Sequence, residues 1–171
     1  MARVVVLLGA PGSGKSTIGE LLGASGFRWR EWEPIILERW GSREAFVAAK
    51  AEALPLLHRE IRSWIDEDGP IAVIETTGLS DAAFVDDLDA TGDSFIVRLD
   101  VSEAEALRRV ESRDPGRHLS DDVTANAAVW RAFRDFVVPT RRCDLVIDMD
   151  ATSAADAAEQ VASAVVDHAS S

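Results

Sequence analysis

The stretch that decides the fold is Gly9-Ala10-Pro11-Gly12-Ser13-Gly14-Lys15-Ser16-Thr17. Its residues 9–16 fit the phosphate-loop pattern G-x-x-x-x-G-K-[ST] at every fixed position. The glycines let the backbone curl so that successive N–H groups point into one concavity, which suits anionic oxygens. The ammonium group of Lys15 can reach the β- and γ-phosphates of a nucleotide, and the hydroxyl of Ser16 is a ligand for Mg²⁺. We therefore expect residues 9–17 to bind ATP with Mg²⁺, and GTP remains an open alternative.

The surroundings of this stretch fit a phosphate loop. Residues 4–8 form a continuous apolar run, which predicts a strand buried on both faces, and residues 15–24 have a helical pattern. Further strands are expected at 27–30, 71–75, 94–100 and 144–148. Helices are expected at 33–40, 43–66 with a kink or break at Pro55, from Ser80 to 89, from Ser102 to 113, at 121–138, and after Ser153. This alternation predicts an α/β fold, a three-layer αβα sandwich around a five-stranded parallel sheet.

Bulk properties narrow the class of protein. A chain of 171 residues fits one domain, here expected over residues 1–171. The formal net charge of −12 argues against a general nucleic-acid binder, because phosphate backbones repel such a surface. Cys143 is the only cysteine, which excludes an intrachain disulfide, and we expect it to be a buried small hydrophobe. No stretch approaches transmembrane length, so we expect a cytoplasmic protein that does not contact membranes, either a monomer or a homodimer.

Carboxylates are expected at the tips of the strands beside the phosphate loop. Glu75 ends the strand at 71–75, where a carboxylate can hold Mg²⁺ together with Ser16 or position water. The alternative for Glu75 is an ordinary solvated residue at a strand end. Asp100 ends another strand and either serves the site or starts the next helix. Asp148 and Asp150 flank the last strand, in a loop that holds the nucleotide base or in a solvated turn.

Arginines cluster around the break Asp114-Pro115-Gly116. A mobile arginine-bearing segment over about residues 113–122 would bring positive charge to the γ-phosphate and exclude water, and Arg113 and Arg117 are the candidates for this role. The alternative is a charged helix face, which we favour for Arg108. Glu105 and Arg109 are spaced as an ordinary i,i+4 ion pair, and His118 is a weaker candidate for a base.

These motifs resemble the small P-loop kinases related to shikimate, gluconate and nucleoside-monophosphate kinases. The resemblance spans nearly the whole chain, and residues 9–17 are its only sharply diagnostic part. It implies five parallel strands, an acceptor-binding region after the second strand, here about residues 30–67, and a lid after the fourth helix. In that family an aspartate near the end of the second strand often orients or deprotonates the acceptor hydroxyl. Residues 27–34 contain no aspartate, and of Glu31 and Glu33 we favour Glu33 as its substitute.

The resemblance implies a kinase that transfers the γ-phosphoryl group to a small hydroxyl-bearing molecule whose identity stays open. The alternative is a nucleotide-dependent switch or ATPase without an acceptor, which the absent aspartate favours. Two further groups in the acceptor region have two interpretations each. The tryptophans either stack on a substrate or pack helices against the sheet, and the basic residues either hold an anionic acceptor or lie on solvated faces. The tryptophans are Trp29, Trp32, Trp40 and Trp64, and the basic residues are Arg39, Arg43, Lys50, Arg59 and Arg62.

Overall fold

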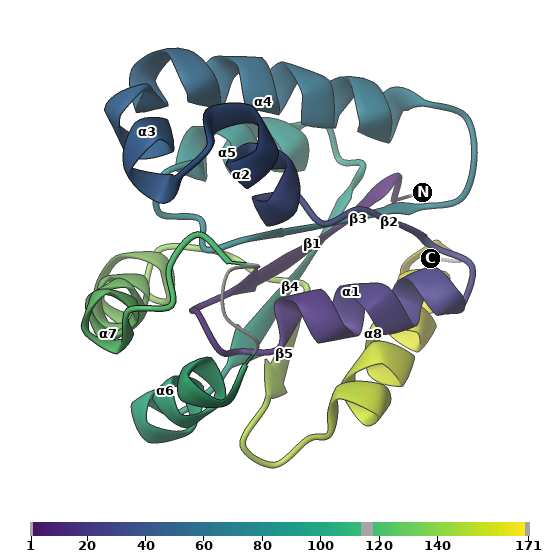
Figure 1. Ribbon diagram of the computed structural model, residues 1–171. Coiled ribbons are helices and arrows are strands. Elements are labelled where there is room, and N and C mark those ends of the chain that lie inside the picture. The colour runs from purple at the N-terminus through teal and green to yellow at the C-terminus, as the bar shows by residue number, and fades with distance from the viewer. Residues whose placement is uncertain (1, 114–117, 170–171) are drawn as a thin grey trace.

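The computed structural model describes residues 2–113 and 118–169. A five-stranded sheet with the order β2-β3-β1-β4-β5 lies at its centre, and all neighbouring strands pair in parallel (Figure 1). The strands are β1 Val4–Gly9, β2 Arg28–Trp29, β3 Ala72–Thr76, β4 Ser94–Asp100 and β5 Leu145–Asp148. The carboxyl ends of all strands therefore meet at one edge of the sheet, where open α/β sheets bind their ligands.

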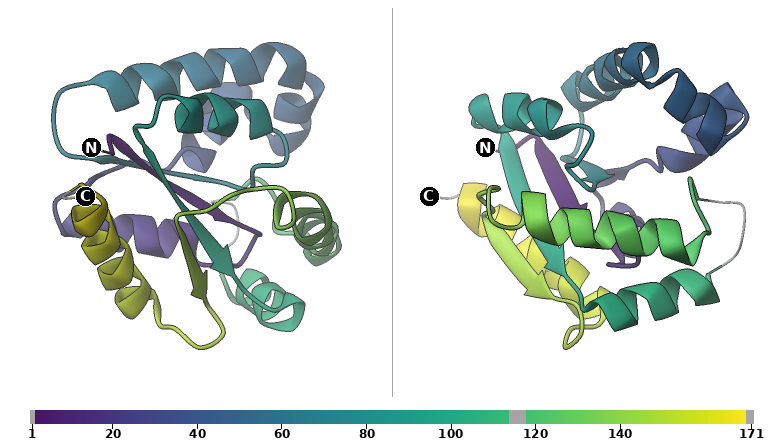
Figure 2. Two further views of the ribbon diagram at one scale, coloured as in Figure 1. Left: turned by 180° about the vertical axis from the view of Figure 1, so that it is seen from behind. Right: turned by 90° about the vertical axis from the view of Figure 1, so that its left-hand side faces the viewer.

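Helices cover both faces of the sheet. They are α1 Lys15–Ala24, α2 Glu33–Trp40, α3 Arg43–Ala48, α4 Lys50–Asp66, α5 Ala82–Ala90, α6 Glu103–Ser112, α7 Val123–Ala132 and α8 Ala154–Ala169. Helices α1 and α8 lie on one face and α2 to α5 on the other, while α6 and α7 lie near the carboxyl ends of the strands (Figures 1 and 2). The expected three-layer α/β sandwich is confirmed.

The core is split by the alternation of side chains along β1. Val4, Val6 and Leu8 pack in one cluster with α2 to α5, whereas Val5 and Leu7 pack in a second cluster with α1 and α8. All of these side chains are at most 1% exposed. A strand covered on both faces is apolar at every position, which is why residues 4–8 show no polar alternation. This packing fixes the end of β1, and with it the start of the phosphate loop.

The structure corrects three expectations about helices. The break within residues 43–66 lies at Ala49 and not at Pro55, which is inside α4. Ala53, Leu57, Ile61 and Ile65 are buried along one face of α4, and this packing offsets the hydrogen bond that Pro55 cannot donate.

The other two corrections concern helix ends. The N-cap position of α5 is Asp81 rather than Ser80, and its side chain makes no capping hydrogen bond. The Ser80 hydroxyl instead accepts a hydrogen bond from Lys50 Nζ at 2.6 Å. The helix expected over 121–138 divides into α7 and a π-helical turn, Phe133–Val137, which buries Phe133 and Val137 in the core. Among the residues described, no helix has both the length and the apolar character needed to cross a bilayer.

Candidate active site

The phosphate loop joins β1 to α1 in the expected geometry. Gly12 and Gly14 have φ values of 77° and 92°, in the left-handed region that residues with a Cβ atom rarely adopt. A Cβ atom on Gly12 would also lie 2.2 Å from the carbonyl oxygen of Ala106, so α6 packs directly on this loop. The backbone path therefore favours glycine at both positions, and close packing also requires it at Gly12.

The side chain of Lys15 folds over the loop. Its Nζ donates hydrogen bonds to the carbonyl oxygens of Gly9 at 2.9 Å and Ala10 at 3.0 Å. Burial lowers the pKa of Lys15, the charges of Glu75 and Glu33 oppose that shift, and Arg113 adds to it. The loop also contains Ser13, whose Oγ is buried and has no hydrogen-bond partner within the described part of the chain. A lysine held on backbone carbonyls and an unpaired hydroxyl suit an anionic ligand.

Ser16 and Glu75 meet where the loop faces the end of β3. The Ser16 hydroxyl lies 3.1 and 3.0 Å from the two carboxylate oxygens of Glu75 and donates to them. Burial raises the pKa of Glu75 to about 7, although Lys15 lowers it, and the charge of Glu33 raises it further. A cation at this position would favour the ionised form of Glu75.

These two side chains fit Mg²⁺. Over residues 2–113 and 118–169, no group of three or more His, Cys, Asp or Glu side chains is placed to hold a metal ion. Mg²⁺ usually takes one or two protein oxygens, with phosphate oxygens and water completing its shell. Ser16 and Glu75 supply such a pair beside the phosphate loop, and their role toward a metal ion stays a prediction.

Glu33, the first residue of α2, is bound by residues of the expected lid. Its Oε2 lies 3.1 Å from Nδ1 of His118 and accepts the backbone N–H of Leu119 at 3.3 Å. Burial opposes the ionisation of Glu33, but the hydrogen bond and charge of His118, the charge of Lys15 and the Leu119 N–H together lower its pKa. Glu33 thus lies within electrostatic range of the phosphate-loop lysine, and its contact with His118 was not foreseen.

The lid arginines are placed only in part. Arg113 directly follows α6, donates a hydrogen bond to the carbonyl oxygen of Ser120, and lies 3.5 Å from the Asp121 carboxylate. It therefore ties the two ends of the expected lid together, and its role toward a γ-phosphate stays a prediction. Arg117 lies outside the described residues. Arg108 is 65% exposed and binds Glu105, in keeping with the charged helix face favoured for it.

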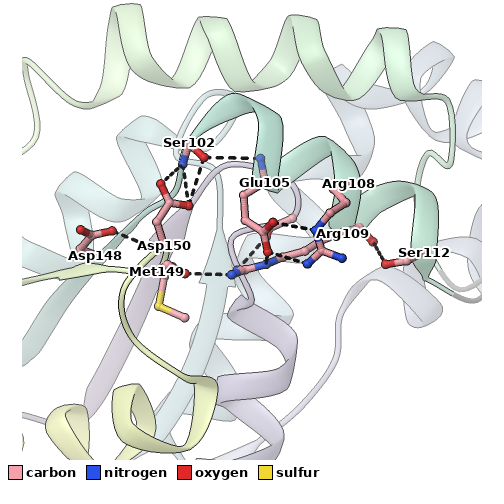
Figure 3. A network of polar contacts seen from close by, with 9 residues as sticks. Ser102, Glu105, Arg108, Arg109, Ser112, Asp148, Met149 and Asp150 are labelled. Carbon is pink, nitrogen blue, oxygen red and sulfur yellow. Dashed lines mark hydrogen bonds and ion pairs between the residues drawn. The ribbon is translucent and has the colours of Figure 1, made fainter.

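The remaining aspartates make structural contacts. Asp100 pairs with Arg98 on its own strand at 2.9 and 3.0 Å. Asp150 accepts hydrogen bonds from the N–H and hydroxyl of Ser102, and one oxygen of Asp148 accepts from the N–H of Asp150 (Figure 3). Ser102 and Glu105 have the spacing of a capping box, of which only one half is formed. Ser102 accepts from the Glu105 N–H, but the Glu105 side chain turns to Arg108 and Arg109.

The tryptophans pack within the protein. The ring of Trp29 lies against Gly19, where a Cβ atom would come within 2.4 Å of it. Trp32 and Trp64 meet edge to face with ring centroids 5.9 Å apart, and Trp40 meets Phe46 at 5.3 Å. The interpretation as packing groups is therefore correct for these contacts. One polar group is left over: Nε1 of Trp32 is buried, with no hydrogen-bond partner in the described ranges.

Some of the basic side chains in this region are engaged elsewhere. Arg39 forms an ion pair with Glu60 at 2.7 Å, and Lys50 binds Ser80. Cys143 is half-buried against the core, and burial raises the pKa of its thiol, in line with a packing role.

Arg109 is the residue that sequence reasoning missed. Beyond its expected pair with Glu105, its guanidinium group donates to the carbonyl oxygens of Gly12 at 3.4 Å and Met149 at 2.8 Å (Figure 3). Sequence spacing showed only the pair within α6. The two carbonyl contacts depend on tertiary packing of α6 against two loops, which no local pattern encodes.

The comparisons with known proteins support the fold. No family model and no curated protein matches the chain. Among solved structures it is similar to shikimate kinase from Acinetobacter baumannii in complex with shikimate, at 16% identity and a TM-score of 0.73, over 98% of this chain and 95% of the other. A gluconokinase from Sinorhizobium meliloti gives 19% and 0.65, over 98% and 93%. Deoxyadenosine kinase from M. mycoides with bound dATP gives 14% and 0.56, over 95% and 98%. The chain therefore has the fold of the small-molecule and nucleoside P-loop kinases, as the resemblance in its sequence implied.

Proposed function

We propose that this protein is a magnesium- and ATP-dependent phosphotransferase that moves the γ-phosphoryl group to a small hydroxyl-bearing molecule. One observation carries the proposal: Lys15, the Ser16–Glu75 pair and Glu33 come together at the carboxyl edge of the sheet from three separate segments. The solved structures with the same fold include kinases for shikimate, gluconate and deoxyadenosine. Their acceptors are small molecules, and the net charge of −12 also disfavours a nucleic-acid substrate.

Each residue has a distinct task in this reaction. The backbone N–H groups of the loop and the ammonium group of Lys15 hold the triphosphate and offset its negative charge. Ser16 and Glu75 would hold Mg²⁺, which would supply further positive charge beside the phosphates. In this proposal Glu33 orients the acceptor hydroxyl and accepts its proton, and Arg113 and Arg117 would supply positive charge toward the γ-phosphate. Catalysis of this kind is mostly positioning and charge stabilisation.

Glu33 can keep its lid partners in this role. Its Oε2 is held by His118 and Leu119 in the structure. An incoming hydroxyl can use the other carboxylate oxygen of Glu33 while the two lid residues hold Oε2. The contact therefore orients the carboxylate and brings the lid to the start of α2. Its lowered pKa keeps Glu33 ionised at neutral pH, as a proton acceptor requires.

The second candidate function is a nucleotide-dependent switch or slow ATPase without an acceptor. Two observations favour it: residues 27–34 have no aspartate, and the carboxylate that would replace it is engaged by the lid. In that case the Glu33–His118 contact would form or break with the bound nucleotide, and no acceptor would be involved.

Release of ADP separates the two functions. The purified protein is incubated with ATP and Mg²⁺, alone and with a panel of hydroxyl-bearing metabolites that covers neutral, cationic and anionic compounds. We expect one class of acceptor to stimulate ADP release and to be recovered as its phosphate ester. ADP release at the same rate with every compound and with none, and without a phosphorylated product, would establish the switch instead.

A further inference from the structure

Helix α6 lies against two loops that are far apart in the sequence. Its backbone packs on the phosphate loop, where the Ala106 carbonyl leaves no room for a side chain at Gly12. One turn later, Arg109 donates from Nη1 to the Gly12 carbonyl oxygen at 3.4 Å and from Nη2 to the Met149 carbonyl oxygen at 2.8 Å. Met149 directly follows β5. One guanidinium group thus spans the phosphate loop and the loop after β5 (Figure 3).

The guanidinium group of Arg109 also binds a side chain of its own helix. Nε of Arg109 donates to Oε1 of Glu105 at 2.7 Å, and Glu105 in turn accepts two hydrogen bonds of 2.7 Å from Arg108. At the start of α6, Asp150 binds the N–H and hydroxyl of Ser102. The loop after β5 is therefore hydrogen-bonded to Ser102, which caps α6, and to Arg109 within α6. The phosphate loop is hydrogen-bonded to the same helix through Arg109 and Gly12.

The two loops also approach each other directly. The side chain of Met149 is 2% exposed, and its Cε would lie 3.7 Å from a Cβ atom on Gly14. A nucleotide whose phosphates sit on residues 9–17 has its nucleoside beside the loop, at the carboxyl edge of the sheet. The loop after β5 is at that edge and borders the phosphate loop. Its aspartates are directed to backbone groups, Asp148 to Asp150 N–H and Asp150 to Ser102.

We propose that Arg109 is a positioning residue that fixes the distance between the phosphate loop and the loop after β5, so that one nucleotide can contact both at once. This inference rests on the proposed function, since it assumes that the ligand is a nucleoside triphosphate. A planar guanidinium group with donors in a rigid fork can hold two carbonyl groups at a set separation, whereas a lysine ammonium on a flexible stem cannot. When two subsites are held in register, a ligand that fills both gains affinity beyond that of its parts.

The test compares a ligand that fills both subsites with a ligand that fills one. Dissociation constants for ATP and for inorganic tripolyphosphate, each with Mg²⁺, are measured by calorimetry for wild type, Arg109→Ala, Arg109→Lys and Arg108→Ala. Arg108→Ala is the matched control, because Arg108 donates its hydrogen bonds to the same Glu105 and to neither loop within the described residues. Circular dichroism and thermal unfolding check that each variant is folded.

We expect Arg109→Ala and Arg109→Lys to weaken ATP binding by roughly 10- to 30-fold, the scale of lost hydrogen bonds from a charged donor. Tripolyphosphate binding should change by less than about threefold, because that ligand does not use the distance between the loops. Arg108→Ala should bind both ligands as wild type does. If Arg109→Ala does not fold, Arg109→Lys, which keeps the charge and most of the volume, carries the test.

Three results would overturn the inference. Wild-type ATP affinity in Arg109→Lys would mean that charge alone matters, and equal losses for ATP and tripolyphosphate would mean that Arg109 only supports the phosphate loop. Unchanged ATP binding in Arg109→Ala would remove any role for it. A wild-type protein that binds no ATP contradicts the proposed function itself, which distinguishes that failure from the failure of this inference.

Discussion

The proposed nucleotide side and the proposed acceptor side of the site are built in different ways. The nucleotide side is a run of nine residues, 9–17, whose shape comes from backbone dihedrals at Gly12 and Gly14 and from one lysine folded over it. The acceptor side is assembled from Glu33 on α2 and from His118 and Leu119 of the expected lid, while Glu75 at the end of β3 pairs with Ser16 between the two sides. A site made of local backbone can be recognised from its pattern. A site made of side chains from distant segments becomes visible only when the chain has folded.

Removing the lysine of the nucleotide side should have the largest effect. Lys15→Ala deletes the ammonium group that we propose to hold the phosphates, and we expect turnover to fall by about 10³-fold or more, the scale of one lost charge-stabilising group. The fold should remain, because the Lys15 ammonium group donates its hydrogen bonds to two carbonyl groups of the loop itself. ADP release and far-UV circular dichroism measure the two quantities.

Lys50→Ala is the matched control for this substitution, since Lys50 is the other lysine of the chain and binds Ser80 in the acceptor half. It should bind ATP as wild type does. Normal turnover in folded Lys15→Ala would show that Lys15 is not needed for the reaction. Equal losses of ATP binding in both variants would show that the loss is not specific to the phosphate loop.

Glu75 links the two sides, and its substitution should be nearly as costly. Glu75→Gln keeps the hydrogen bond with Ser16 but removes the charge proposed to hold Mg²⁺. We expect kcat to fall by about 10²-fold and the Mg²⁺ concentration for half-maximal activity to rise by about tenfold. Glu159→Gln, an exposed carboxylate on α8, is the control and should leave both values unchanged. Wild-type dependence on Mg²⁺ in Glu75→Gln would place the metal ion elsewhere.

The pH dependence of stability gives an independent view of Glu75. Its pKa is about 7 in the fold, above the ordinary value of 4.5, so between those values the folded state keeps a proton that the unfolded state has released. The free energy of unfolding therefore falls as pH rises from about 4 to about 7, by at most about 3 kcal/mol from this group. Glu75→Gln should be more stable than wild type at pH 8 and equal to it at pH 4.

Urea unfolding at the two pH values, without nucleotide or Mg²⁺, measures that difference. Glu159→Gln should track wild type at both pH values. Equal stability of Glu75→Gln and wild type at pH 8 would show that folding does not raise the pKa of the Glu75 carboxyl group.

Substitution of Glu33 should affect the acceptor side alone. Glu33→Gln keeps the shape but removes the proton acceptor, and we expect kcat/KM for the acceptor to fall by about 10²-fold, with ATP affinity within about threefold of wild type. Glu31→Gln is the neighbouring comparison, because the sequence left Glu31 and Glu33 both open. The measurement is initial velocity at varied acceptor concentration. A larger loss in Glu31→Gln than in Glu33→Gln would transfer the role to Glu31.

Trp32 should show the smallest effect. Trp32→Phe removes a buried indole N–H that has no partner among the residues described, so the free energy of unfolding should change by less than about 1 kcal/mol. Trp130→Phe removes an indole hydrogen bond to the Val101 carbonyl at 3.1 Å and should cost about 1–2 kcal/mol. If the N–H of Trp32 serves the acceptor, only Trp32→Phe should raise the acceptor KM, by about threefold. Equal losses of stability in both variants would show that Trp32 is also hydrogen-bonded in solution.

The sequence was a good guide wherever the cause of a structure is local. The run 4–8, the phosphate loop and the helix 15–24 are confirmed because apolar continuity and glycine spacing act within a few residues. Pro55 shows the limit of such reasoning. A proline predicts a break, but burial of one face of α4 against the sheet outweighed it, and the chain broke at Ala49 instead.

Contacts in the site between segments that are far apart in the sequence cannot be predicted from local patterns. Glu33 was favoured through a family resemblance, yet its contact with His118 joins residues 85 positions apart. Arg109 illustrates the same point, since its spacing from Glu105 explains one hydrogen bond, while those to Gly12 and Met149 arise from tertiary packing. The roles of Arg113, Glu33 and Glu75 in catalysis stay predictions for the experiments above.

The central claim is that residues 9–17 form a cradle for a magnesium-bound triphosphate. Calorimetric titration of the intact protein with ATP and Mg²⁺ tests it most directly, with GTP titrated in parallel. We expect saturable binding at one site per chain that weakens by at least about tenfold in Lys15→Ala. No saturable binding with either nucleotide would contradict the account.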